Sequence, residues 1–522
     1  MSRFTANNIK LVLITIVPIL IIVTLFIFAL NAYPVLGGDS AYYIPSAINH
    51  RLDRGLVNQL SPQFLVGDLS GTGRHLISPP LFPLVISWLM PTGTSQGAHI
   101  AIFILYAITI IAAAVIYKKV IISDWQEISW YGVAIYIATL FALASAIIFD
   151  SGRPETLSRL LISLALLGLL GPRLRWLWLF FGFLLGLALA TNPASAILFA
   201  PLIGLFFAFY HPPKKALAYG LSALMVSLFT FVFVLEVFGY GLAPTTKGMY
   251  HHFSQLNSQL GAQEYIDRVV LGRSVEPVLQ KATTRSGVIK PFLSDFSPLG
   301  AVSPGRIVAL AILCMSFWYS RHRKHAPSPI LWHFFVILTA AIFSYFIFIR
   351  PGAQYLFSIA PLFFLVIVHW TTNYSHSIIL KSVAFIVIVA GSVFFFQRLT
   401  LFPFFIKDGM SLREARAIFK ELSLNPDERL NVDSTIWAIS ENYGPMRLWN
   451  QVPDVLYPTG ITIMREGFNG WKELPANWDY CRKTNDFFIR KEPLVFGLPI
   501  TETGIMPGYA FSIYDCPSSK KK

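Results

Sequence analysis

Residues 11–30 read LVLITIVPILIIVTLFIFAL, an apolar run of 20 residues without a charged side chain. A helix needs about 20 such residues to cross the hydrocarbon core of a bilayer. The run follows Arg3 and Lys10, is longer than the apolar core of a signal peptide and lacks a small-x-small cleavage site. The sequence therefore predicts a retained transmembrane helix at this position.

Similar apolar runs recur along most of the chain. Of its 522 residues, 55% are hydrophobic and 13% are charged, and the mean hydropathy is +0.59. Soluble domains do not have such a composition. Further spans are centred near residues 107, 138, 164, 182, 201, 227, 311, 340, 362 and 388. We therefore predict an α-helical polytopic membrane protein with about 11 transmembrane helices.

Basic residues between the spans predict the orientation of the chain. They are Lys118 and Lys119, Arg173 and Arg175, Lys214 and Lys215, and the run at 321–325. All fall on one side if the N-terminus is cytoplasmic, as the positive-inside rule requires. An odd number of spans then places the C-terminal segment outside. These loops also account for part of the net charge of +14, so the charge does not call for nucleic acid as a partner.

The first outer segment, residues 32–97, carries the first candidate catalytic residue. Asp39 lies within the stretch GGDSAYY at 37–43, just after the first span. One interpretation makes Asp39, together with Ser40, the N-cap of a helix. The other makes it a general base at the membrane surface that accepts the proton of an attacking hydroxyl. The two roles are compatible if one lone pair of the carboxylate faces a cleft.

Two short helices are expected in the same outer segment. One lies near residues 47–54. The other, over residues 80–89, is apolar but too short to span a bilayer. Its length and composition suit the membrane interface.

A tight outer loop at residues 150–155 holds the second cluster. Asp150, Arg153 and Glu155 lie where one span ends and the next begins, and Arg159 follows inside that next span. A local ion pair with interfacial snorkelling is one interpretation of the loop. The other is a functional site, and an arginine within a span is a candidate for such a site by default.

A third cluster, at Arg350 and Tyr355, lies between two late spans. An arginine at the outer end of a span presents a planar fork suited to phosphate, although it also serves as an ordinary interfacial anchor. Glu236, near the outer end of its span, is a possible partner for one of these arginines, and Lys247 suits an anionic headgroup. Weaker candidates on the outer side are Tyr42, Tyr43, Arg74, His75 and the pair His251 and His252.

From residue 402 onward the chain is more polar. A helical pattern over 412–422 and short apolar runs at 446–449, 487–489 and 510–514 alternate in the manner of a small α/β domain. We therefore divide the chain into a transmembrane module at 1–401 and an outer domain at 402–522. Cys481 and Cys516 both lie in the outer domain, where an oxidising compartment favours a disulfide over two free thiols.

No cofactor follows from the sequence. No spacing of His and Cys residues defines a zinc site, and a divalent metal is left open. A glycine-rich phosphate-binding loop of the Lys-Ser/Thr type is absent from the sequence, which argues against direct ATP chemistry.

Several motifs resemble those of one enzyme superfamily. The first span followed by GDSAYY at 38–43, PPLFPL at 79–84, GRPETL at 152–157, and RPGAQY at 350–355 occur in this order. Together they are similar to motifs of the polytopic GT-C glycosyltransferases, which include protein O-mannosyltransferases and lipid A aminoarabinose transferases. The resemblance covers about the first 400 residues, and the tail is similar to the outer domain of some members. The chain departs from the better-known members at Ser40, where they have an acidic residue after the aspartate.

The resemblance implies a function and roles for the candidate residues. Asp39 would be the catalytic carboxylate, Asp150 a second acidic residue near the acceptor or donor, and Arg350 and Arg153 the cations on the donor phosphate. The donor would be a polyprenyl-phosphate sugar and the acceptor a glycolipid, a polysaccharide or a protein of the cell envelope. One inverting displacement on the outer face of a bacterial inner membrane would need a single base, unlike the carboxylate pair of retaining hydrolases.

Two other classes of protein are compatible with a polytopic membrane chain. A secondary transporter would place polar residues near the middle of its spans and often contains internal repeats. Here the charged residues gather at the outer ends of the spans. A non-catalytic assembly or lipid-handling protein would depend on its outer domain more than on Asp39.

Overall fold

The computed structural model describes the N-terminal half of the chain almost continuously and the C-terminal half in short segments. The described residues are 2–31, 40–58, 60, 73–76, 78–121, 130–148, 152–170, 176–193, 200, 203–204, 207, 211–249, 361, 382, 421, 430–432, 437–438, 446–448, 460–465, 480–488, 494–495, 498–499 and 510–517.

Most of the described residues are helical. The helices are α1 (Ser2–Asn31), α2 (Ser40–Arg51), α3 (Leu81–Leu89), α4 (Ser95–Ile121), α5 (Trp130–Ile148), α6 (Glu155–Leu170), α7 (Leu177–Thr191) and α9 (Pro213–Phe238). Residues 242–249 add a further helical segment after α9.

Three helices in the described part of the chain are long and apolar enough to cross a membrane: Asn7–Ile27, Ser95–Lys119 and Pro213–Phe238. Helices α5, α6 and α7 coincide with three more of the predicted spans. The spans expected near 311, 340, 362 and 388 lie almost wholly outside the described residues. The predicted total of 11 spans therefore stays a prediction.

Helices α1, α4 and α5, which coincide with the first three predicted spans, alternate in direction, as successive spans must. Lys10 of α1 lies 5.3 Å from the centre of the Trp130 ring at the start of α5, and Tyr136 of α5 donates a hydrogen bond to the carbonyl of Ile14. The side chain of Gln96, at the start of α4, instead donates to the carbonyl of Ala29 at the end of α1. Helices α1 and α5 therefore run in the same direction, and α4 runs against them.

Helices α7 and α9 pack closely through small residues. A Cβ added at Gly182 would lie 2.5 Å from the carbonyl oxygen of Ala223, and one added at Gly186 would lie 2.5 Å from Cβ of Thr230 and 2.6 Å from the carbonyl oxygen of Ser227. Between membrane helices, small residues allow this close approach and so maximise van der Waals contact.

The two expected outer helices are present with different bounds. The apolar helix predicted over 80–89 is α3, Leu81–Leu89, and the side chains of Leu81, Phe82 and Leu84 are buried. The other is α2, which begins at Ser40 instead of near residue 47 and ends at Arg51. Pro45 lies inside α2, where its nitrogen cannot donate to the carbonyl of Ala41, and the side chain of Asn58 donates to that carbonyl instead.

The described C-terminal segments form a mixed five-stranded sheet with the order β2-β1-β3-β7-β4. Its strands are β1 (Leu430–Val432), β2 (Met446–Leu448), β3 (Gly460–Arg465), β4 (Arg482–Phe488) and β7 (Ala510–Cys516), and β5 (Leu494–Val495) pairs separately with β6 (Leu498–Pro499). Strands β2, β1 and β3 are parallel, whereas β7 runs antiparallel to both β3 and β4.

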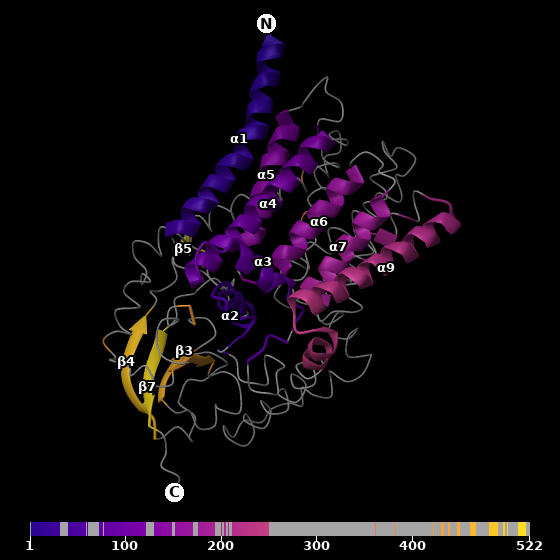
Figure 1. Cartoon of the computed structure of the whole chain (residues 1–522). Coiled ribbons are helices and arrows are strands. Elements are labelled where there is room, and N and C mark those ends of the chain that lie inside the picture. The colour runs from indigo at the N-terminus through magenta and orange to yellow at the C-terminus, as the bar shows by residue number, and fades with distance from the viewer. Residues whose placement is uncertain are drawn as a thin grey trace, which may run out of the picture.

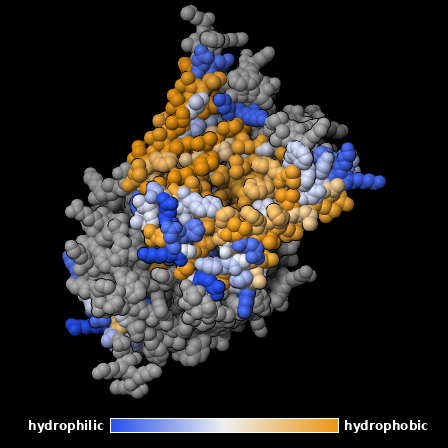
Figure 2. Space-filling model, in the orientation of Figure 1, coloured by the Kyte–Doolittle hydropathy of each residue, from blue (hydrophilic) through white to orange (hydrophobic). Residues whose placement is uncertain are grey.

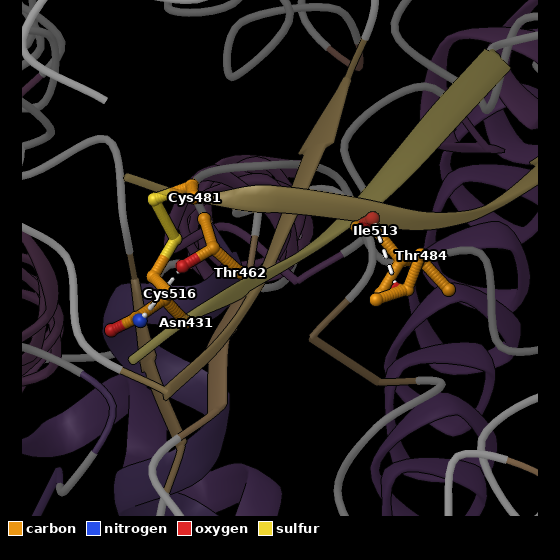
Figure 3. The surroundings of a disulfide bond; sticks show 6 residues. All are labelled: Asn431, Thr462, Cys481, Thr484, Ile513 and Cys516. Carbon is orange, nitrogen blue, oxygen red and sulfur yellow. Dashed lines mark hydrogen bonds between the residues drawn. A yellow bond between two sulfur atoms is a disulfide. The ribbon is translucent and has the colours of Figure 1, made fainter. Parts of the chain in front are cut away.

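A disulfide joins Cys481 to Cys516 at one edge of this sheet (Figure 3). Cys481 lies directly before β4 and Cys516 ends β7, and these two strands are paired, with Arg482 opposite Asp515. Two side-chain hydrogen bonds lie nearby: Asn431 donates to Thr462 Oγ1 at 3.1 Å, and Thr484 donates to the carbonyl of Ile513 at 3.2 Å.

Helices α2 and α3 and the sheet lie at the end of the helix bundle opposite the N-terminus (Figure 1). Figure 2 shows a broad apolar face across the helices, hollowed between α1 and α9, with polar residues along its lower edge. Large apolar side chains exposed on α1, α4, α7 and α9 include Ile16, Leu20, Ile111, Phe183, Leu228 and Phe233. These exposed residues are what a lipid-facing surface requires.

Candidate functional site

The first turn of α2 is the centre of the candidate site. The helix begins at Ser40, whose side chain is fully buried. Asp39 lies outside the described residues; in the chain it directly precedes Ser40, the first residue of α2. Its role as an N-cap, in which a carboxylate accepts from free N–H groups of the first turn, stays a prediction.

The predicted second outer loop packs directly against Ser40. Gly152 has a φ of +85°, and a Cβ added to it would lie 2.5 Å from Cβ of Ser40. Only glycine combines this left-handed backbone with so close an approach. The structure thus brings the loop of the second cluster to the residue that follows Asp39. Asp150 itself lies outside the described residues.

Arg153 and Glu155 form the local ion pair that was one of the two interpretations of this loop. Nε of Arg153 lies 3.3 Å from Oε2 of Glu155, and the side chains are 17% and 2% exposed. Glu155 is also the first residue of α6, where a negative charge complements the helix dipole. Both residues therefore have a structural role in the loop.

Arg159 is fully buried one turn further along α6. Helix α6 packs against α4, and Tyr106 of α4 is an electrostatic neighbour of the guanidinium. Tyr106 is itself buried. A buried guanidinium is costly unless nearby groups solvate it, and its place in the helix that follows the Gly152 loop keeps Arg159 among the candidates for an anion site.

His75 is buried between α2 and the start of α3. Its Nδ1 lies 3.2 Å from Oγ of Ser46, and its Nε2 lies 3.0 Å from Oγ of Ser78. The ring of Tyr43 lies 6.0 Å from that of His75. Both ring nitrogens thus contact hydroxyls, so His75 ties α2 to the segment that leads into α3.

Asn58 fixes the start of α2 from the other side. Its side-chain amide donates to the carbonyls of Ala41 and Tyr42, at 2.9 and 3.0 Å. Asn58 is buried, and its own oxygen accepts from the backbone N–H of Leu60. Buried amides with several satisfied hydrogen bonds give a precise local geometry.

The remaining described candidates lie around the end of α9. Arg74 lies over the ring of Tyr240, with 5.7 Å between its guanidinium carbon and the ring centre. The carboxylate of Glu236 accepts a hydrogen bond from the backbone N–H of Leu242 at 2.9 Å. It thereby caps the segment at 242–249. Arg350, one of the arginines suggested as a partner for Glu236, lies outside the described residues. Lys247, on that segment, is exposed.

The C-terminal part of the chain also reaches α2. The indole N–H of Trp437 donates to Oγ of Ser40 at 3.1 Å, and both side chains are buried. No local sequence pattern predicts this contact, because 397 positions separate the two residues. A single tryptophan within a polar segment does not predict which residue it contacts in the folded chain.

Four of the sequence-predicted site residues lie outside the described part of the chain: Asp39, Asp150, Arg350 and Tyr355. The same holds for His251 and His252. Their roles stay predictions. Within the described residues, no group of three His, Cys, Asp or Glu side chains is placed to hold a metal ion.

Comparison with family models and with curated proteins gives no match. Two crystal structures of the oligosaccharyltransferase of Archaeoglobus fulgidus are similar to this chain at 12% identity. The apo form has a TM-score of 0.44 and the match covers 84% of this chain and 64% of that one. The form with Zn and sulfate has a TM-score of 0.47 and the match covers 91% and 72%.

The chain thus spans less than two thirds of the length of the first of these structures. At this identity and these TM-scores the likeness assigns neither a family, a substrate nor a mechanism to this chain.

Proposed function

We propose that this protein is a membrane glycosyltransferase that moves a sugar from a polyprenyl-phosphate donor to an acceptor of the cell envelope. The observation that carries the proposal is the contact between Gly152 and Ser40. It joins the segment that follows Asp39 to the loop that follows Asp150, at one end of a helix bundle that presents a broad apolar face (Figures 1 and 2). Acidic residues next to a lipid-facing surface suit a reaction between a lipid-borne donor and a water-borne acceptor.

The reaction we propose is one inverting displacement. The acceptor oxygen attacks the anomeric carbon of the sugar, the bond from that carbon to the phosphate oxygen breaks, and polyprenyl phosphate leaves with the bonding electrons. The Asp39 carboxylate takes the proton of the acceptor hydroxyl. Arg350 and Arg153, with Tyr355 and Lys247 as further candidates, would stabilise the charge that develops on the phosphate.

The environment of α2 supports a general base at its start. Asn58, Ser40 and the Gly152 loop hold the first turn through hydrogen bonds and close packing. A catalytic group must be held to within a fraction of an ångström to be effective. Contacts that hold the neighbouring backbone, such as these, supply that precision. The donor's hydrocarbon chain would lie along the exposed apolar residues of the bundle. We place the reaction on the outer face of a bacterial inner membrane.

The experiment is a donor panel on the purified full-length protein in lipid nanodiscs. Polyprenyl phosphates carrying a neutral hexose, an amino sugar or a pentose are incubated with it, together with glycolipid, polysaccharide and peptide acceptors. We expect one donor to be consumed, with release of polyprenyl phosphate and appearance of the sugar on an acceptor. If no donor is consumed while proteoliposomes accumulate a solute, the protein is a transporter and the proposal is wrong.

A further inference from the structure

The contact between Trp437 and Ser40 links the two ends of the chain at the candidate site. The indole N–H lies 3.1 Å from Oγ of Ser40. Trp437 is 2% exposed and Ser40 is 0% exposed. A buried indole N–H needs an acceptor, because leaving it without one costs about 1–3 kcal/mol. Ser40 supplies that acceptor from the helical part of the molecule.

The side chain of Ser40 is enclosed from two sides. Trp437 contacts its hydroxyl, and Gly152 lies against its Cβ so closely that any larger residue would overlap. Just beyond Ser40, the amide of Asn58 holds the carbonyls of Ala41 and Tyr42. The first three residues of α2 are therefore held by three separate parts of the chain.

Trp437 lies in a turn that follows strand β1 in the chain. Strand β1 ends at Val432, and residues 437–438 form a turn beyond it. Strand β1 lies inside the sheet, between β2 and β3. The indole is thus carried by a segment close in the chain to an interior strand, which gives it a firmer base than an isolated loop would have.

We propose that Trp437 is a positioning residue for the catalytic carboxylate, acting through Ser40. This inference rests on the proposed function, since it assumes that Asp39 is the base. Trp437 does not touch the reacting atoms. Its hydrogen bond orients the first residue of α2, and thereby the acid immediately before it. The outer domain is then part of the active site's framework, in addition to any role in binding the acceptor.

The test compares Trp437→Phe, which removes the N–H but keeps an aromatic ring, with Ser40→Ala, which removes the acceptor but keeps the Cβ against Gly152. Each variant should lower kcat by about 10- to 100-fold, because a displacement of about 1 Å at a catalytic group costs that much. The KM for the donor should change less than about twofold, since no donor contact is lost. Trp176→Phe is the matched control, because Trp176 is 66% exposed, and it should leave kcat unchanged.

The double variant separates positioning from general weakening of the fold. If the two residues act through one hydrogen bond, Trp437→Phe with Ser40→Ala should lower kcat no further than either change alone. Hydrogen exchange gives a second measurement that does not depend on catalysis. The N–H groups of the first turn of α2 should exchange faster in both single variants, whereas those of α4 should exchange at the wild-type rate.

The outcomes distinguish this inference from the proposed function. If the wild-type protein transfers no sugar, the proposed function fails. If Asp39→Asn keeps full transfer activity, the assignment of Asp39 as the base fails, and this inference fails with it. If Asp39→Asn inactivates the enzyme while Trp437→Phe and Ser40→Ala keep wild-type kcat, the positioning role alone is wrong. It is also wrong if their effects multiply in the double variant, or if kcat falls only in proportion to the folded fraction seen by gel filtration.

Discussion

Two of the close contacts in the described part of the chain lie between α7 and α9 and between the Gly152 loop and the start of α2. In both, an added Cβ would lie 2.5 Å from a neighbouring atom. At the first, Gly182 and Gly186 have ordinary helical geometry and meet another helix. At the second, Gly152 has a left-handed backbone, and a hydrogen bond from Trp437 reaches the residue it touches.

The difference between the two contacts lies in their direction and precision. Close packing of small residues holds two membrane helices together, but it tolerates small rotations and shifts. A hydrogen bond between buried groups has a preferred length and angle, so it specifies orientation as well. The contact at Ser40, which follows the candidate base in the chain, therefore specifies an orientation. The contact between α7 and α9 mainly holds two helices together. Each of the following predictions breaks or sharpens this comparison.

Gly186→Leu should have the largest effect, because it breaks the α7–α9 contact. The new side chain would overlap Thr230 and the carbonyl of Ser227. Overpacking of this size costs about 3 kcal/mol or more, so we expect little folded protein by gel filtration in detergent. Gly220→Leu, on α9 itself, is the matched control, because no atom lies within 4 Å of its Cβ position. Equal yields of the two variants would contradict the packing described here.

Removing the disulfide should have the next largest effect. It acts on the sheet whose strand β1 precedes Trp437 in the chain. The bond closes a loop with a sequence separation of 35, and such bonds stabilise a fold by about 2–4 kcal/mol. The double variant Cys481→Ser, Cys516→Ser should lower the thermal midpoint of the transition in which the sheet unfolds. Cys314→Ala, which leaves both of these cysteines in place, should not share that effect. An unchanged midpoint would show that the sheet holds its geometry without the bond.

Gly152→Ala should disturb the second contact without removing any charged group. A left-handed backbone costs a non-glycine residue about 1–2 kcal/mol, and the new methyl would also push against Ser40. We expect transfer activity to fall by up to about 100-fold. Gly55→Ala is a matched control, since Gly55 has a φ of +78° but its Cβ position is 3.7 Å from the nearest atom. If both variants lose activity equally, strain alone explains the loss.

The smallest expected effect is a pH dependence of stability that comes from the contact between His50 of α2 and Ser87 of α3. His50 Nδ1 lies 2.7 Å from Oγ of Ser87, and burial lowers the pKa of His50 below its ordinary value of 6.5 although Asp53 opposes the shift. The folded protein then binds fewer protons than the unfolded chain, so stability is full above pH 6.5 and decreases as the pH falls below it. The thermal midpoint should drop between pH 7.5 and 5.5, and less so in His50→Asn. An identical drop in both proteins would exclude His50 as its source.

The sequence predicted those features whose signals are local. The apolar run at 80–89 gave α3, and the runs at 446–449 and 510–514 gave strands β2 and β7. Gly182 and Gly186, four residues apart in an apolar run, carried a signal for close helix packing that was not used. Strand β1 was missed because three residues are too few to show a period.

The contacts of the candidate site were beyond sequence reasoning for a physical reason. Ser40 and Trp437 are 397 positions apart, and neither the hydroxyl nor the indole shows a preference for a particular partner until the chain is folded. The same holds for His75, whose two hydroxyl partners come from α2 and from the segment before α3. Ser40, noted in the sequence as part of a possible N-cap and as a departure from an acidic residue, accepts a hydrogen bond from Trp437 in the structure.

The activity of Asp39→Asn tests the central claim most directly. Asparagine caps a helix as well as aspartate does, so this variant keeps the helix start while it removes the base. Asp53→Asn is the matched control, because Asp53 lies just after α2 with a φ of 59°, a conformation that asparagine also tolerates. We predict that sugar transfer falls by about 10²- to 10⁴-fold in Asp39→Asn and is unchanged in Asp53→Asn. Wild-type transfer by a folded Asp39→Asn protein would contradict the assignment of Asp39 as the base.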